Sequence, residues 1–169
     1  AFPITETQKI FLKVDKQHSS LFVEPGMKYN VFVPVSDSTK YVNRNLPSDV
    51  GLFIKDNNDP QELNNLIIDF NVHTDDLCIY YYTLFAISHV RNKLDSFTKA
   101  TIKNYSTVKN DYFRKHVEYS LGSLNYGVSQ GKKNPEEPYF VGKPILYHNY
   151  EYMYLFNDIF KQYLQKAAY

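Results

Sequence analysis

The side chains best suited to acid–base chemistry in this chain are His73, Asp75 and Asp76, which lie close together in the sequence. A histidine beside carboxylates is used both for general acid–base catalysis and for metal binding. However, the five histidines form no H-x-x-x-H or H-E-x-x-H pattern, and the single cysteine cannot supply a set of thiolate ligands. The sequence therefore predicts no metal site, and a small enzyme built around these three residues stays open as an alternative.

Other catalytic patterns are incomplete. Cys78 lies in an apolar run, where burial raises the pKa of a thiol and makes it unreactive. Gly122 and Gly127 have the glycine spacing of a P-loop, but the lysine that must follow is absent. Adjacent carboxylates such as Glu136 and Glu137 point apart in a strand or a turn. We therefore expect no enzyme, no catalytic residues and no cofactor.

Aromatic residues are abundant: the chain has 16 Tyr and 12 Phe but no Trp. Aromatic side chains that stack on single-stranded nucleic acid lie in a basic groove. The formal net charge is only +1, and few Lys or Arg are interleaved with the tyrosines. We expect the tyrosines to build the core and its rim, and we expect no nucleic-acid partner.

Length and composition set the class of protein. A chain of 169 residues fits a single domain, 1–169, and a hydrophobic fraction of 43% excludes a disordered chain. No apolar run reaches the length of a membrane-spanning helix, so no membrane partner is expected. The N-terminus does not have the pattern of a signal peptide, and a single cysteine favours the cytosol.

The elements that must position any functional side chain are predicted mainly as strands. Alternation of apolar residues predicts strands at residues 8–14, 27–35 and 66–72, with a tight turn at Glu24-Pro25-Gly26. The apolar and aromatic run 77–90 favours a long buried strand, with a buried helix as the alternative.

Two segments predict helices. Ser106 or Thr107 is positioned to cap a helix that extends to Glu118. Residues 150–168 form an amphipathic helical tail for which Asn149 is the expected N-cap. The predicted fold class is thus mainly β, with antiparallel strands and two or three short helices.

Three segments, 9–35, 79–89 and 138–153, together resemble the poxvirus host-range family typified by the short host-range protein of vaccinia virus. The last of them has an aromatic pair after a polar turn and then a Pro-aliphatic-x-Tyr pattern. The resemblance includes diverged paralogues such as those of leporipoxviruses. It implies a compact antiparallel β-sandwich wrapped by short helices.

The resemblance also implies a function. Members of this family are not enzymes; they act in the host cytoplasm and antagonise a host antiviral restriction factor that contains a sterile alpha motif domain. On this basis the chain is expected to be a monomeric host-range factor that serves immune evasion by binding such a protein.

Binding in the family is attributed to loops at one edge of the sandwich. The positions in this chain that match those loops are Glu24 and Pro25 in the first turn and Ser48 and Asp49 in a later loop, to which a basic turn adds Lys132 and Lys133. The absence of Trp, and a Glu-Pro-Gly turn where a basic residue is expected, are departures from the family. A ligand- or carbohydrate-binding β-sandwich module and a structural viral protein remain as alternatives.

Overall fold

The computed structural model describes residues 3–14, 17–33, 48–49, 51–55, 58–81, 90–129 and 136–167. Most of these residues are helical, so the prediction of a mainly β fold with an antiparallel β-sandwich is wrong. The elements in chain order are β1 (Gln8–Val14), β2 (Gln17–Val23), β3 (Val31–Phe32), β4 (Ser48–Asp49), β5 (Phe53–Ile54), α1 (Leu63–Tyr81), α2 (Val90–Asn104), α3 (Asp111–Ser129), α4 (Glu136–Tyr139) and α5 (Tyr150–Ala167).

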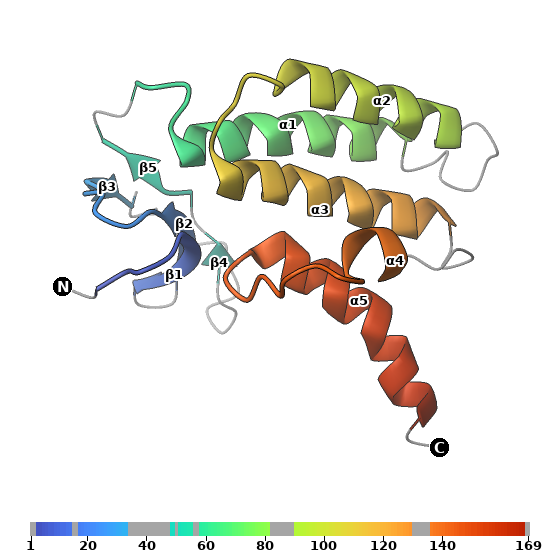
Figure 1. The fold of residues 1–169 in the computed structure, drawn as a ribbon. Coiled ribbons are helices and arrows are strands. Elements are labelled where there is room, and N and C mark those ends of the chain that lie inside the picture. Colours follow the sequence, from blue (N-terminus) through green and yellow to red (C-terminus); the bar gives the residue numbers. More distant parts are fainter. Residues whose placement is uncertain are drawn as a thin grey trace.

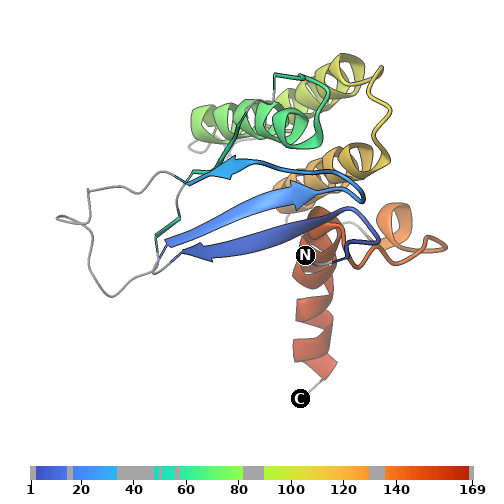
Figure 2. The ribbon, with the colours of Figure 1, turned by 90° about the vertical axis from the view of Figure 1, so that its left-hand side faces the viewer.

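The strands form two small sheets at one end of the helices (Figures 1 and 2). β1 and β2 make an antiparallel hairpin in which Lys9 pairs with Phe22, and β4 joins β2 in parallel at Gln17 and His18. β3 and β5 form a separate antiparallel pair. The predicted strand at 8–14 is confirmed, whereas the segment predicted as a strand at 27–35 forms a ladder only at β3 within its described part.

The predicted turn after β2 is confirmed. Gly26 has a φ of +76°, a conformation that favours glycine, and the Met27 amide donates to the Glu24 carbonyl oxygen over 3.3 Å. The turn reverses the chain beside the start of α3, because Asn110 donates its side-chain amide to Glu24 Oε1 over 2.8 Å.

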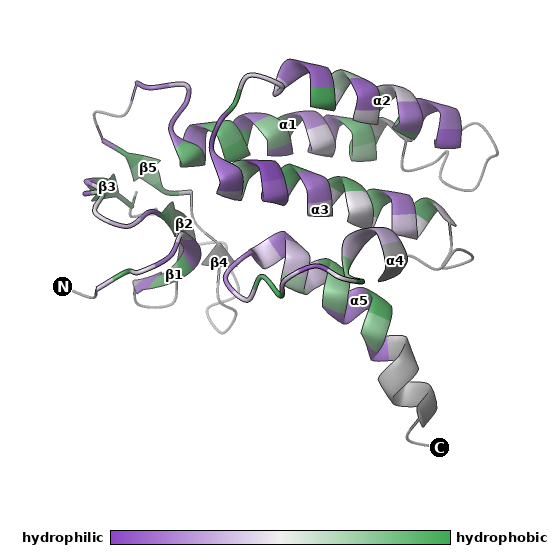
Figure 3. Ribbon diagram, viewed as in Figure 1, coloured by the Kyte–Doolittle hydropathy of each residue, from purple (hydrophilic) through white to green (hydrophobic). Residues whose placement is uncertain are grey.

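Helices α1, α2 and α3 lie side by side, with successive helices antiparallel, and α5 crosses beneath α3 (Figure 1). Figure 3 shows that α2 is largely hydrophilic, whereas hydrophobic residues recur along α1 and α3. One hydrophobic cluster joins α1 and α3 to β2 and to the segment before α3; its buried members are Phe22, Leu63, Leu66, Ile67, Phe70, Val108, Phe113, Val117 and Leu121.

The strand predicted at 66–72 is wrong, because these residues belong to α1. The alternation of Leu66, Ile68, Phe70 and Val72 that predicted it is also compatible with a helical period. Leu63, Leu66, Ile67 and Phe70 are buried on one face of α1, while Ile68 and Val72 are more than half exposed. The long strand predicted at 77–90 is also wrong where it is described, since α1 continues to Tyr81 and α2 begins at Val90. Residues 82–89 lie outside the described residues.

Helix α3 has two buried faces. Phe113, Val117 and Leu121 face α1, while Tyr119 on another side joins Tyr152, Leu155 and Ile159 of α5 in a second cluster. At Gly122 the two helices come so close that a Cβ atom there would lie 2.9 Å from Leu155 Cδ2. The C-terminal helix is thus held against α3 by burial of its apolar stripe.

Asparagine side chains cap the N-termini of α3 and α5. Asn149 Oδ1 accepts from the Tyr152 amide over 2.9 Å, which confirms Asn149 as the N-cap of α5. The predicted start of the preceding helix at Ser106 or Thr107 is wrong, because Asn110 Oδ1 accepts from the Phe113 amide over 3.0 Å and α3 begins at Asp111. In the part of the chain that the structure describes, no helix is long and apolar enough to cross a membrane.

Candidate functional site

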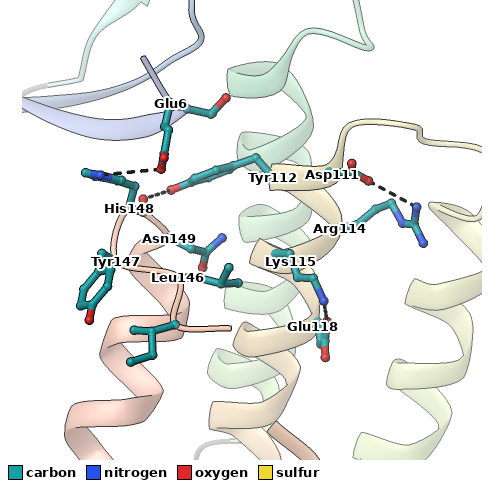
Figure 4. A pocket seen from close by; sticks show the side chains of 12 residues that line it. Glu6, Asp111, Tyr112, Arg114, Lys115, Glu118, Leu146, Tyr147, His148 and Asn149 are labelled. Carbon is teal, nitrogen blue, oxygen red and sulfur yellow. Dashed lines mark hydrogen bonds and ion pairs between the residues drawn. The ribbon is translucent and has the colours of Figure 1, made fainter. Parts of the chain in front are cut away.

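An open groove of about 860 Å³ runs along the N-terminal half of α3 (Figure 4). Three segments that are far apart in the sequence form its walls: the residues before β1, the first turns of α3 and the turn before α5. The lining residues are Glu6, Thr7, Asp111, Tyr112, Arg114, Lys115, Glu118, Ile145, Leu146, Tyr147, His148 and Asn149. This volume is in the range of about 300–1,000 Å³ that ligand sites occupy.

Tyr112 ties two walls of the groove together. Its hydroxyl donates to the His148 carbonyl oxygen over 3.1 Å and accepts from the Tyr150 amide over 3.4 Å. Burial raises the pKa of Tyr112 to about 12, so the hydroxyl remains protonated and able to donate. The start of α5 is therefore fixed relative to α3, and the turn at residues 145–148 is held in place.

Oppositely charged side chains lie in pairs along the groove. Glu118 accepts from Lys115 over 2.7 Å and from Lys143 over 3.0 Å. Burial alone would raise the pKa of Glu118. The hydrogen bonds and positive charges of the two lysines outweigh this effect, so the pKa of Glu118 lies below its usual value. Elsewhere Arg114 lies 3.5 Å from Asp111, and His148 Nε2 lies 3.7 Å from Glu6 Oε2, both pairs being largely exposed (Figure 4).

The turn before α5 adds apolar surface to these charges. Tyr147 is 70% exposed and Ile145 is 53% exposed, although both line the groove. Exposed aromatic and aliphatic side chains beside charged ones are typical of the anchor positions of protein interfaces.

Polar side chains from β1, α1 and α5 surround the buried His116 of α3. His116 is 2% exposed; its Nε2 lies 3.4 Å from Asn71 Oδ1, and its Nδ1 lies 4.0 Å from Glu151 Oε1. Burial, together with the positive charge of Lys9, lowers the pKa of His116 to about 4. Burial raises the pKa of Glu151 despite the opposing charge of Lys9, whose Nζ lies 4.1 Å from the centre of the Tyr150 ring.

The hydrogen bonds of Tyr112 in the groove join its walls to one another. The Tyr112 hydroxyl is hydrogen-bonded to two backbone groups, and not to an imidazole or a carboxylate, which are the bases that activate a nucleophile. No group of three or more potential ligands that could hold a metal ion occurs among the residues the structure describes. Within the groove Lys115 lies beside Glu118, and Arg114 lies beside Asp111.

The structure places Glu24 and Pro25 in the turn that follows β2. The backbone amide of Glu24 donates to the Tyr29 hydroxyl over 3.1 Å, and its carboxylate accepts from Asn110, so Glu24 braces the start of α3. Pro25 is exposed. Neither residue lines the groove.

Ser48 and Asp49 form β4 and pair with Gln17 and His18, at the opposite end of β2 from Glu24. Seven residues of β2 at about 3.3 Å each separate the two predicted positions by roughly 20 Å, so the structure does not bring them together. Lys132 and Lys133 lie outside the described residues.

The alternative site at His73, Asp75 and Asp76 lies on α1. His73 Nδ1 is 2.7 Å from the Asp69 carbonyl oxygen, one turn earlier on the same helix, and all three side chains are exposed. His73 thus interacts with its own helix, and none of the three residues lines the groove.

Sequence reasoning missed Tyr112, Lys115, Tyr147 and His148. One signal was present: Asn149 was correctly predicted as an N-cap, which places residues 145–148 in a turn directly before a helix. Nothing local indicated that this turn lies against the residues before β1 and the start of α3.

Comparisons with protein-family models, with curated proteins and with solved structures found no match. The resemblance to the poxvirus host-range family therefore stays a prediction, while the sandwich fold that it implied is overturned.

Proposed function

We propose that the protein works by binding an extended segment of a partner protein in the groove along α3, without catalysing a reaction. The observation that carries this proposal is that the exposed pair Ile145 and Tyr147 lines the same groove as a row of charged side chains on α3. From the function expected on the basis of the sequence, the proposal retains only the binding of another protein. It leaves out the edge loops of a sandwich and the host restriction factor, which depended on the implied fold.

The lining suggests what such a segment contains. Asp111, Arg114, Lys115 and Glu118 present both signs of charge along two turns of α3. An apolar side chain of the partner would pack on Tyr147 and Ile145, and flanking charged side chains of both signs would meet the row on α3.

Selection from a displayed library of random peptides tests the proposal. Peptides enriched on the unmodified protein are synthesised, and their affinities are compared with those for Tyr147→Ala and Ile145→Asp. Both side chains are mostly exposed, so these variants are expected to fold. Ile68→Asp is the matched control, since Ile68 is 57% exposed on α1, away from the groove.

We expect the groove variants to weaken binding by about ten-fold or more, which corresponds to about 1.4 kcal/mol, and the control to leave it unchanged. Peptides that bind all variants equally, or a selection that yields no binder, would overturn the proposal. Binding on a glycan array that is lost in Tyr147→Ala would favour a carbohydrate ligand instead.

A further inference from the structure

A second cavity, of about 840 Å³, lies between α2 and α3. Its deep wall is formed by core residues of α3, among them Val117 and Leu121, and by Val108 before that helix. It shares only Arg114 and Glu118 with the groove described above. The volume suits a small molecule, and the lining is mostly apolar.

Ile102 of α2 leaves apolar surface uncovered in this cavity. It lines the cavity and is nevertheless 60% exposed. Covering such surface with an apolar chain is favourable by about 25 cal/mol for each Å² removed from water. An apolar chain lying between Ile102 and Val117 would cover it.

One end of the cavity is basic. Lys109 and Arg114 lie there, near the start of α3, whereas Leu121 is about 10 Å further along the helix at 1.5 Å per residue. The one acidic lining residue, Glu118, is already neutralised by Lys115 and Lys143. Within the described part of the chain Lys109 forms no ion pair, and Arg114 meets Asp111 only at 3.5 Å in an exposed position.

From this arrangement we infer that the cavity between α2 and α3 binds an anionic amphiphile, a free medium-chain fatty acid. Its carboxylate lies between Lys109 and Arg114, and its chain runs along α3 between Ile102 and Leu121. The cavity and the groove share Arg114 and Glu118, but the variants that test the two proposals differ, so failure of one proposal is distinguishable from failure of the other.

Calorimetric titration of the full chain with decanoate, below its micellar concentration, tests the inference. The variants are Lys109→Glu, which reverses the charge at the basic end, and Ile102→Glu, which places a charge beside the chain. Both positions are exposed, so folding is preserved. Lys103→Glu is the matched control, because Lys103 is exposed on α2 next to Ile102 and does not line the cavity.

We expect saturable binding of decanoate that weakens about ten-fold or more in Lys109→Glu and in Ile102→Glu, with less than a two-fold change in Lys103→Glu. The neutral 1-decanol should bind Lys109→Glu as it binds the unmodified protein. Absence of saturable binding, or equal affinities in all variants, would overturn the inference. Loss of affinity in Ile102→Glu alone would overturn the role given to the basic end.

Discussion

The side-chain amide of Asn64 is hydrogen-bonded to both backbone groups of Phe22. Asn64 Oδ1 accepts from the Phe22 amide over 2.8 Å, and Asn64 Nδ2 donates to the Phe22 carbonyl oxygen over 2.9 Å. Both residues are buried, and they lie 42 positions apart. The Asn64 side chain of α1 thus forms the two backbone hydrogen bonds that a neighbouring strand would form with Phe22 of β2. These bonds hold the hairpin against the helices.

Replacing Asn64 by Leu is expected to destabilise the protein by about 3 kcal/mol. The side chains have similar volumes, but the substitution leaves the buried amide and carbonyl of Phe22 without partners. Urea unfolding followed by circular dichroism measures the change. Asn92→Leu, on the exposed side of α2, should change stability by less than about 0.5 kcal/mol. Equal stabilities of the two variants would contradict this account.

Two glycines of α3 should respond in opposite directions to alanine. A Cβ atom at Gly122 would lie 2.9 Å from Leu155 Cδ2 and 2.9 Å from Tyr139 Cε1, whereas one at Gly127 meets nothing within 4 Å. Gly127→Ala should stabilise the helix by up to about 1 kcal/mol. Gly122→Ala should destabilise the protein by about 1–3 kcal/mol, because fully buried Leu155 has little room to move. Thermal unfolding compares them, and a gain in both variants would refute the close contact.

Acid should destabilise the protein through His116. Its pKa falls from 6.5 unfolded to about 4 folded, so between these values the unfolded chain binds more protons. Stability should therefore decrease as pH falls from 7 to 4, by about 3 kcal/mol. Protonation of Glu151, whose pKa is raised, acts in the opposite direction. Urea midpoints at pH 7 and pH 5 should differ less in His116→Gln than in the unmodified protein, and an unchanged difference would exclude His116 as the cause.

Loss of the N-cap of α5 should cost about 1 kcal/mol. Asn149→Ala removes the acceptor for the Tyr152 amide, whereas Asn149→Ser retains a hydroxyl that can accept in the same position. Unfolding in urea should therefore rank the unmodified protein first, the serine variant second and the alanine variant last. An alanine variant as stable as the serine variant would show that the cap contributes nothing.

What the sequence could predict was local. The hairpin strand at 8–14, the turn at Gly26 and the cap at Asn149 each depend on neighbouring residues alone. The segment at the start of α1 carried two periods at once: Leu66, Phe70 and their alternating neighbours suggested a strand, while Leu63 and Ile67 completed a helical stripe. Packing of that stripe on Phe113 and Val117 decides between them, and this contact joins residues too distant for a local pattern to reveal.

The groove was hidden from the sequence for the same reason. Tyr112, His148 and Glu6 have unremarkable neighbours, and their proximity arises only when α5 docks on α3 and the chain before β1 lies across both. The prediction that the tyrosines build the core is confirmed at Tyr119 and Tyr152, which are 1% exposed, but not at Tyr147, which is 70% exposed.

Helix α3 contributes side chains to both hydrophobic clusters, with Phe113 in one and Tyr119 in the other. Neither cluster can lose its packing without exposing part of the same helix to water. The protein should therefore unfold in one cooperative transition, and the backbone amides near the middle of α3 should be among the slowest to exchange with deuterium.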